Sequence, residues 1–303
     1  MPIFYMTVGL PGSGKSTYAK RLAETPGTKV HSSDSIRAEL TGDENNQDIN
    51  ELVFKTLHRR VKDDLRAGFD VIYDATNIKW QKRKSFLSEL FALKIPDLNT
   101  VCLFFVVPVE TCIEMQASRD RQVPEAVIRR MHTNIDIPMY CEGWGDIHII
   151  QSIDKDYYEL METLEELQHD NPHHTLTVGF HCHMTARNLL GIPTLPIVHV
   201  AALLHDIGKL YTKTFVNSKG EVTDVAHFYN HENVGAYESF FYTSKMSAAD
   251  RLYIAKLIRW HMYPYAIQRS DNPEKTKRKF KNICSVEERE HIRALNIADR
   301  AAH

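Results

Sequence analysis

The chain has 303 residues, of which 43% are hydrophobic and 25% are charged, and its formal net charge at pH 7 is −2. This composition is typical of a globular protein, and the length allows two ordinary domains, each with its own core. We expect no membrane partner, because no apolar run approaches the roughly 20 residues that span a bilayer and the N-terminus does not resemble a signal peptide. The small net charge excludes broad, charge-driven coating of nucleic acid, although a strand end could still enter a local basic cleft.

Cysteine and histidine are distributed differently along the chain. The five cysteines are scattered and form no CxxC pair, which predicts reduced thiols in a cytoplasmic protein rather than a disulfide framework. Of the 16 histidines, four precede residue 169 and twelve lie at or after it. This shift indicates two chemistries, and it makes metal binding a hypothesis for the second half.

Short apolar runs alternate with helical patterns through the first half of the chain. The runs at 3–8, 28–33, 69–76, 100–107 and 146–152 are predicted strands, and the segments near 15–24, 48–67, 79–93 and 124–134 are predicted helices. The alternation predicts an α/β domain over 1–152, in which a parallel sheet carries helices on both faces.

The second half has another pattern. Residues 153–170 form an acidic helical stretch that we interpret as a linker, followed by Asn171-Pro172. Beyond it the segments around 174–191, 196–209, 230–242, 247–261 and 285–302 all have helical patterns, and no strand alternation is convincing. We therefore predict an all-α domain over 171–303. No internal repeat is present.

The segment Gly9 to Ser16 matches the motif G-x-x-x-x-G-K-[ST] in full, between a predicted strand and a predicted helix. Glycines let backbone N–H groups wrap phosphates, and the helix N-terminus adds its positive end. Lys15 would reach the β- and γ-phosphates and Ser16 would supply a hydroxyl to Mg²⁺. The motif predicts binding of ATP with Mg²⁺, and the residues assigned to it are Gly9, Gly12, Ser13, Gly14, Lys15, Ser16 and Thr17. It does not identify the phosphate acceptor.

Asp34 and Arg37 follow the second predicted strand, and both could act on the molecule that accepts the phosphate. In a small P-loop kinase this strand end faces the γ-phosphate, so Asp34 could take the proton of an acceptor hydroxyl. Arg37, one helical turn further on, could hold an acceptor phosphate. The alternative is that Asp34 only caps the helix that begins at residue 35.

Further candidates follow the third strand and precede the last helix of the first half. Asp74 ends a buried strand, where a carboxylate would orient Mg²⁺ or its waters, although 76–77 could also be turn residues. Arg119 and Arg121 could neutralise charge on the transferring phosphoryl group, or be surface arginines of a loop. The basic cluster 79–84 is interpreted as a solvated helix face rather than a nucleic-acid patch.

Together these motifs resemble the kinase module of bacteriophage and bacterial polynucleotide kinases, over about the first 150 residues. The resemblance rests on GLPGSGKS, on D-x-x-R from Asp34 to Arg37, on D-x-T-N from Asp74 and on arginines before V-P. It implies transfer of the ATP γ-phosphate to a 5′-hydroxyl end, with Asp34 as the general base and Arg37 on the phosphate next to the acceptor nucleoside. Both Arg119 and Arg121 remain candidates for the lid arginine.

The second half contains an adjacent pair, His205-Asp206, which gives one nitrogen and one carboxylate oxygen to a divalent metal. An earlier histidine (His181 or His183) and a later aspartate, Asp299, could complete the site. His231 and His261 lie between them on predicted helices.

The order H…HD…H…H…D resembles the HD phosphohydrolase superfamily across residues 173–303. The resemblance implies that His181, His205, Asp206 and Asp299 bind a first metal and that His231 and His261 bind a second metal or the scissile phosphate. It also gives Lys209 a role on the phosphate. The family uses one or two divalent ions, for example Mn²⁺, Ni²⁺, Co²⁺, Fe²⁺ or Mg²⁺, and the residues do not identify which.

A kinase module joined to an HD module resembles bifunctional end-healing enzymes. The implied substrates are RNA or DNA ends: a 5′-hydroxyl for the kinase, and a 2′,3′-cyclic phosphate or a 3′- or 2′-phosphate for the HD domain. An RNA ligase would then seal the ends. Two alternatives remain, namely a small-molecule or nucleoside kinase fused to a nucleotide phosphohydrolase, and a nucleotide-switched regulatory module. The basic stretch 272–282 is either a solvated loop or a contact to the strand. The oligomeric state stays open.

Overall fold

The computed structural model describes residues 1–44, 46, 48–118, 122–172 and 175–302. The chain divides into two compact units. The first comprises residues 1–132 and 138–152, and the second comprises residues 133–137 and 153–303. No described helix is long and apolar enough to span a membrane.

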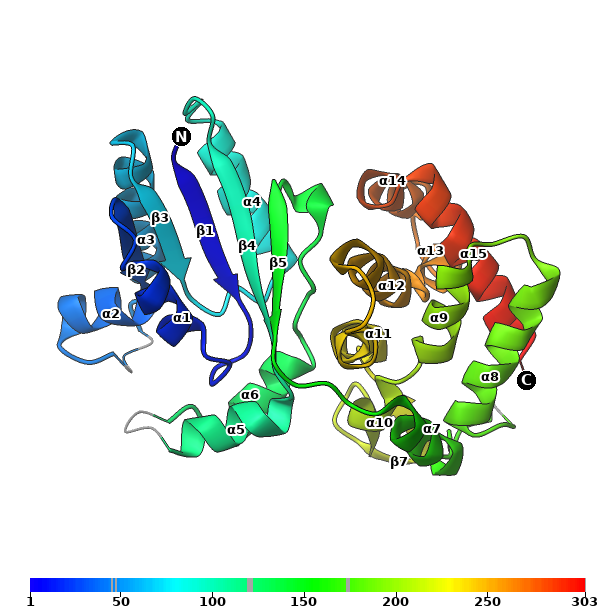
Figure 1. Ribbon diagram of the computed structural model, residues 1–303. Coiled ribbons are helices and arrows are strands. Elements are labelled where there is room, and N and C mark those ends of the chain that lie inside the picture. The colour runs from blue at the N-terminus through cyan, green and yellow to red at the C-terminus, as the bar shows by residue number, and fades with distance from the viewer. Residues whose placement is uncertain (45, 47, 119–121, 173–174, 303) are drawn as a thin grey trace. The chain divides into compact units, whose positions relative to one another are not determined.

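The first unit is built on a five-stranded sheet in which every pairing is parallel, in the order β2-β3-β1-β4-β5 (Figure 1). The central strand β1 is almost fully buried toward its C-terminal end, as expected for a sheet covered on both faces. The strands are β1 (Ile3–Val8), β2 (Thr28–Ser32), β3 (Asp70–Asp74), β4 (Asn99–Val106) and β5 (Asp146–Gln151). The predicted parallel α/β domain is confirmed.

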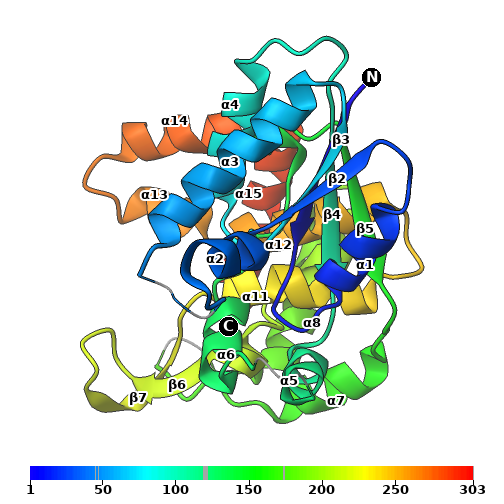
Figure 2. The same ribbon diagram turned by 90° about the vertical axis from the view of Figure 1, so that its left-hand side faces the viewer.

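Helices cover both faces of this sheet. The chain passes from β1 to the edge strand β2 and then returns across the sheet to β3, β4 and β5. Because each crossover is right-handed, this change of direction places α1 on one face of the sheet and α3 and α4 on the other (Figure 2). Buried positions in α3 recur every four residues (Val53, Leu57, Val61, Leu65), so one apolar stripe faces the sheet. The helices are α1 (Lys15–Leu22), α2 (Ser33–Thr41), α3 (Asn50–Arg66), α4 (Trp80–Phe91), α5 (Val109–Ala117), α6 (Glu125–His132) and the 3₁₀ turn η1 (Tyr140–Glu142).

The second unit is mainly helical, as predicted. Four of its helices pack pairwise along α7–α8–α9–α12, and α15 lies against α8 and α9. The helices are α7 (Tyr157–Glu166), α8 (Val178–Asn188), α9 (Pro196–Leu204), α10 (Lys209–Thr212), α11 (His231–Glu238), α12 (Ala248–Trp260), α13 (Tyr263–Gln268), α14 (Pro273–Ile283) and α15 (Val286–Arg300), with 3₁₀ turns η2 (Leu189–Gly191) and η3 (Ser239–Tyr242).

This unit also contains an antiparallel hairpin that the sequence pattern did not predict. Its strands are β6 (Lys213–Val216) and β7 (Val222–Phe228). The turn between them places Gly220 at φ 85°, and the amide of Gly220 donates to Asn217 O. The hairpin ends three residues before His231, so it determines where α11 begins.

The stretch interpreted as a linker packs within the second unit. Asp156 caps α7 by accepting hydrogen bonds from the amides of residues 158 and 159. Lys155 donates to the fully buried Glu238 (2.8 Å) and to the Tyr211 hydroxyl (3.1 Å). Removal of either partner would leave a buried charge or acceptor unsatisfied, so this segment is tied to the helical core.

Candidate functional site

The loop after β1 has the backbone geometry that phosphate binding requires. Gly9, Gly12 and Gly14 have φ values of 156°, 86° and 85°. A Cβ at Gly12 would lie 2.2 Å from the carbonyl oxygen of Cys112, so no larger residue fits there. Gly14 is the N-cap of α1, which leaves the amides of the first turn available to an anion.

The loop lysine folds back over this cradle. Nζ of Lys15 lies 2.5 Å from the carbonyl oxygen of Leu10 and 3.3 Å from Oγ of Ser13. Ser16 and Thr17 follow in the first turn of α1. At the end of β3 the buried Asp74 accepts a hydrogen bond from the Thr7 hydroxyl at 3.1 Å. The carboxyl ends of β1 and β3 thus bring the loop and Asp74 to the same edge of the sheet.

Asp34 lies in the first turn of α2, after β2. The N-cap of this helix is Ser32, whose hydroxyl accepts the Asp34 amide at 3.3 Å. The alternative that Asp34 acts as the cap is therefore wrong, because the capping position is already occupied. Its side chain is 49% exposed, so the carboxylate is accessible.

Arg37 is buried and fixes Asp34. Its Nη1 donates to Oδ1 of Asp34 at 2.8 Å and to the carbonyl oxygen of Glu44 at 3.4 Å, and its Nη2 donates to Oδ1 of Asn50 at 2.9 Å. The guanidinium is thereby held between α2 and α3, with one edge on the exposed carboxylate. The arrangement places a positive charge directly beside a candidate base.

Two other sequence-based candidates have different outcomes. Arg119 and Arg121 lie outside the described residues. Within the cluster 79–84, Arg83 is fully buried, because it forms a bidentate ion pair with Glu142 (both contacts 2.7 Å). The interpretation of this whole cluster as a solvated face is wrong for Arg83, which anchors α4 to the turn η1.

Six residues of the second unit converge from separate helices. His181 comes from α8, His205 and Asp206 from the end of α9, His231 from the start of α11, His261 from the end of α12 and Asp299 from α15. All six side chains are buried. Two groups of possible metal ligands result: His181 with His205 and Asp206, and Asp206 with His231 and His261. Asp206 belongs to both.

The four histidines of the cluster make the same kind of hydrogen bond through Nδ1. Nδ1 of each lies 2.7–2.9 Å from a backbone carbonyl oxygen, namely that of Ala302, Ala202, Phe228 or Ile258. A carbonyl only accepts hydrogen bonds, so Nδ1 carries a proton, and when the ring is neutral its lone pair is on Nε2. This is the tautomer that metal-binding histidines adopt, with the second nitrogen fixed by the protein.

Those lone pairs face other acceptors. Nε2 of His181 lies 3.0 Å from Oδ1 of Asp299, and Nε2 of His231 lies 3.4 Å from Nε2 of His261. Nε2 of His205 is buried and has no hydrogen-bond partner among the described residues. Such contacts are unfavourable unless a proton or a cation lies between the atoms. The donor set therefore fits divalent metal.

The two oxygens of Asp206 face different histidines. Oδ2 lies 3.6 Å from Nε2 of His181 and 3.5 Å from Nε2 of His205. Oδ1 lies 3.3 Å from Nε2 of His231 and 3.8 Å from Nε2 of His261. One carboxylate could therefore serve two adjacent cations. His183, the alternative to His181, is exposed and faces Glu165 at 3.6 Å.

Lys209 lies at the rim of this cluster, and sequence reasoning missed its second partner. Its Nζ is 2.6 Å from Oδ2 of Asp206 and 3.0 Å from Nε2 of His169. His169 is buried, and its Nδ1 donates to the carbonyl oxygen of Leu176 at 2.8 Å. Tyr265 of α13 was also missed; its hydroxyl donates to Oδ2 of Asp299 at 3.3 Å.

Burial and neighbouring charges spread the pKa values of this cluster. Burial, followed by repulsion from His205 and His231, lowers the pKa of His261 to about 3. Burial opposes ionisation of Asp206, but the Lys209 ammonium and the nearby histidines outweigh it and hold its pKa well below the usual range. Asp206 is therefore a carboxylate at neutral pH, as a metal ligand must be.

The loop of the first unit and the cluster of the second define a nucleotide-binding α/β domain joined to a helical domain of the metal-binding type. Residues 4–138 match the family model described as AAA domain, and residues 173–300 match the family model described as HD domain. The phosphate loop thus lies in the part of the chain that matches the AAA domain model, and the histidine–aspartate cluster lies in the part that matches the HD domain model.

Relatives cover parts of the chain. The L-seryl-tRNA(Sec) kinase of Methanococcus maripaludis is 25% identical over 166 residues, which are 52% of this chain and 63% of the relative. The chain therefore matches less than two thirds of the length of this curated relative.

The solved structures that are similar to this chain also match about half of it. A chain of the Pnkp1/Rnl/Hen1 RNA repair complex is 25% identical, with 43% of this chain and 42% of that chain covered and a TM-score of 0.37. A putative kinase from Chloroflexus aurantiacus is 17% identical, with 52% and 90% covered and a TM-score of 0.41.

Proposed function

We propose that this protein heals broken polynucleotide ends with two active sites. The kinase domain transfers the γ-phosphate of ATP to a 5′-hydroxyl end. The HD domain hydrolyses a 2′,3′-cyclic phosphate or a terminal 3′- or 2′-phosphate. The observation that carries the proposal is that one chain combines a phosphate cradle and an accessible Asp34–Arg37 pair with a second, buried cluster of the metal-binding type.

In the kinase site, each residue has a separate task. The loop amides and Lys15 bind the ATP phosphates, while Ser16 and Asp74 hold Mg²⁺. The carboxylate of Asp34, exposed at the end of β2, accepts the proton of the attacking hydroxyl. Arg37 orients that carboxylate. To bind the phosphate that follows the terminal nucleoside, its buried guanidinium would exchange the contact to Glu44 or Asn50 for that phosphate. Arg119 or Arg121 completes the charge neutralisation.

In the HD site, His181, His205, Asp206 and Asp299 would hold one divalent metal, and His231 and His261 would hold a second together with Asp206. A bound metal ion lowers the pKa of a water molecule and neutralises charge on a phosphoryl oxygen. The residues of the chain bind the substrate and orient the metal ligands. Lys209 binds a non-bridging phosphate oxygen, and the backbone carbonyls keep each imidazole in the metal-binding tautomer.

RNA is the preferred substrate in this proposal. Many ribonucleases leave a 5′-hydroxyl on one side of a break and a 2′,3′-cyclic phosphate on the other, so two sites on one chain would serve both ends of the same break. An RNA ligase would be the functional partner that uses the healed ends. The curated relative is named L-seryl-tRNA(Sec) kinase, and a relative named for an RNA-linked substrate supports the choice of RNA.

The test compares acceptors directly. Purified protein is given radiolabelled ATP and Mg²⁺ with a 12-nucleotide RNA that has a 5′-hydroxyl, the matching DNA, or free nucleosides. We expect transfer to the RNA with a kcat/KM at least tenfold above that for nucleosides. Transfer to nucleosides alone would instead support a metabolic kinase, which the net charge of −2 favours. A matched assay with terminal cyclic phosphates tests the HD site.

A further inference from the structure

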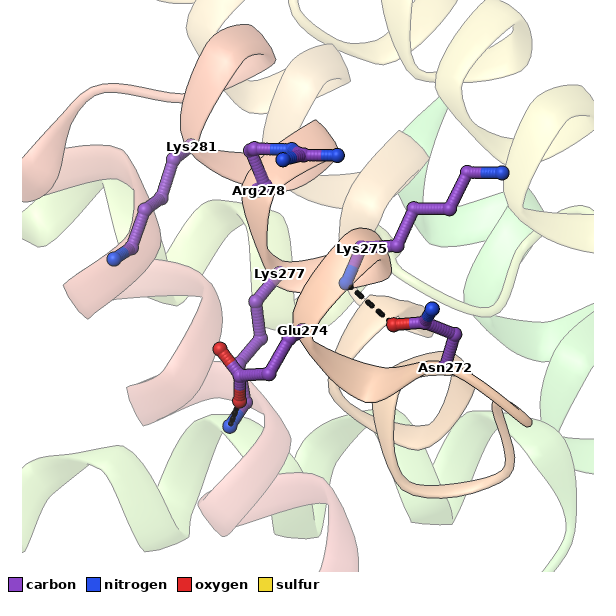
Figure 3. Close-up of a pocket in the computed structure, with 6 residues that line it drawn as sticks. All are labelled: Asn272, Glu274, Lys275, Lys277, Arg278 and Lys281. Carbon is purple, nitrogen blue, oxygen red and sulfur yellow. Dashed lines mark hydrogen bonds and ion pairs between the residues drawn. The ribbon is translucent and has the colours of Figure 1, made fainter.

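Helix α14 presents a row of basic side chains on the surface of the HD domain. Lys275, Arg278 and Lys281 are spaced three residues apart, so they follow one another along the helix with neighbouring Cβ atoms about 5–6 Å apart. Figure 3 shows Lys275 and Arg278 extending in one direction and Lys281 in another. All three are exposed, and they line a surface hollow together with Asn272, Glu274 and Lys277 (Figure 3). The stretch expected to be a solvated loop is therefore mostly helix.

The charge of this surface is unbalanced. Residues 269–281 contain six lysines and arginines against two carboxylates, which gives +4 in a chain whose net charge is −2. One carboxylate, Glu274, is paired with Lys277 at 2.7 Å. Lys275, Arg278 and Lys281 form no salt bridge with any other residue that the structure describes. Like charges on one helix face destabilise the helix, and Glu274, which is paired with Lys277 and also interacts with the charge of Lys281, offsets only part of this cost.

The opposite face of α14 connects it to the metal-type cluster. Phe280 stacks on Tyr263 with ring centroids 4.6 Å apart, and it also contacts Trp260, which directly precedes His261. Tyr265, from the same short helix α13 as Tyr263, donates to Asp299. Two aromatic residues of α13 therefore link the basic helix to the cluster within one domain. The row is held in a fixed position relative to the site.

We propose that the basic row of α14, defined as Lys275, Arg278 and Lys281, binds the phosphate backbone of the RNA strand whose 3′ end is processed by the HD site. The inference rests on the proposed function. A linear array of exposed cations suits a ligand that carries one negative charge on every repeat. Contacts to phosphates do not read sequence, so the row selects a strand over a mononucleotide.

The test uses the triple variant Lys275→Gln/Arg278→Gln/Lys281→Gln in the full chain. The control is Lys20→Gln/Lys219→Gln/Lys245→Gln, which removes the same charge from exposed positions elsewhere. Both are assayed with a 12-nucleotide RNA ending in a 2′,3′-cyclic phosphate and with a mononucleotide 2′,3′-cyclic phosphate. The salt dependence of KM is measured between 50 and 300 mM KCl.

We expect the triple variant to lose about tenfold in kcat/KM on the 12-mer and to keep its activity on the mononucleotide within twofold. For three lost phosphate contacts, the slope of log KM against log salt should fall by about 2. An unchanged slope and unchanged 12-mer kinetics would overturn the inference while leaving the proposed function intact. If the wild-type protein hydrolyses neither substrate, the proposed HD activity fails and the inference fails with it.

Discussion

Nε2 of His169 lies 3.0 Å from Nζ of Lys209 and accepts a hydrogen bond from it. The direction is fixed, because the ammonium only donates and Nδ1 of His169 already donates to a carbonyl oxygen. His169 lies before the segment that matches the HD family model, which begins at residue 173. It holds the lysine against Asp206 from outside the matched region. We therefore assign it as a positioning residue that acts through Lys209.

Replacement of His169 should affect the HD reaction alone. His169→Leu removes the acceptor, and loss of such an outer hydrogen bond typically costs about tenfold in activity. We expect KM for the phosphate ester to rise by about that factor with a smaller change in kcat, while kinase activity is unchanged. His169→Gln keeps an acceptor and should restore most of the loss. Equal KM values for the Leu, Gln and wild-type proteins would contradict the assignment.

The same histidine should make the stability depend on pH. Burial, and then the charge of Lys209, lower the pKa of His169 from 6.5 to about 4. Between these pH values the unfolded chain binds a proton that the folded chain does not, so the free energy of unfolding decreases as the pH falls from 6.5 to 4. In urea unfolding with EDTA, the free energy of unfolding should fall between pH 7 and pH 5 by on the order of 1–3 kcal/mol more in the wild type than in His169→Gln. His261, with a pKa of about 3, adds a loss that both proteins share. Equal losses in both proteins would refute this origin.

Metal binding should require Asp206 and not His183. Asp206 contacts all four cluster histidines, so Asp206→Asn should abolish high-affinity binding of Mn²⁺ at both positions. His183 lies on the same helix as His181, but its side chain is 43% exposed, so His183→Ala is the matched control. Titration calorimetry of the metal-free proteins is expected to give two ions for wild type and for His183→Ala. If Asp206→Asn still binds two ions, the cluster around Asp206 is not the metal-binding site.

Asp34 should be required for chemistry and dispensable for folding. The carboxylate is half exposed, so Asp34→Asn removes the base while the amide oxygen can still accept from Arg37. Loss of a general base typically costs 10²–10⁴-fold in rate, and we expect kcat of the kinase to fall by about that much with KM for ATP unchanged. The exposed Asp43→Asn serves as the control. If Asp34→Asn keeps its kinase activity, Asp34 is not the general base.

The phosphate loop allows a matched test with two glycines. Gly12 and Gly27 have nearly the same φ, 86° and 84°, but a Cβ collides with Cys112 only at Gly12. Both alanine variants should lose about 1 kcal/mol of stability from the positive φ. Only Gly12→Ala should also lose ATP binding, as measured with a fluorescent ATP analogue. If Gly27→Ala loses ATP binding equally, the loop geometry is not the cause.

Local patterns predicted much of this molecule. The P-loop was recognisable because its glycines, lysine and serine are adjacent in sequence, and the strands around it are continuous apolar runs. Asp34 and Arg37 were found because they follow a strand by fixed spacings. In each case the chemistry depends on a few neighbouring residues, which a sequence displays directly.

What escaped prediction depends on contacts between distant residues. The His169–Lys209 hydrogen bond spans 40 positions, and nothing around His169 distinguishes it from a surface histidine. Arg83 is read as exposed until Glu142, 59 residues later, is seen beside it. The hairpin before His231 was overlooked, although a turn ending in Gly220 between two alternating segments was a usable signal.

The most direct test of the account uses one short RNA that carries a 5′-hydroxyl and a 2′,3′-cyclic phosphate. It is incubated with ATP, Mg²⁺ and Mn²⁺ and weighed by mass spectrometry, with wild-type protein, Asp34→Asn and Asp206→Asn in parallel. We predict that wild type adds a phosphate at the 5′ end and water at the 3′ end, and that each variant loses only one of these changes. Unchanged RNA ends, in a preparation that phosphorylates nucleosides or hydrolyses free nucleotides, would contradict the account.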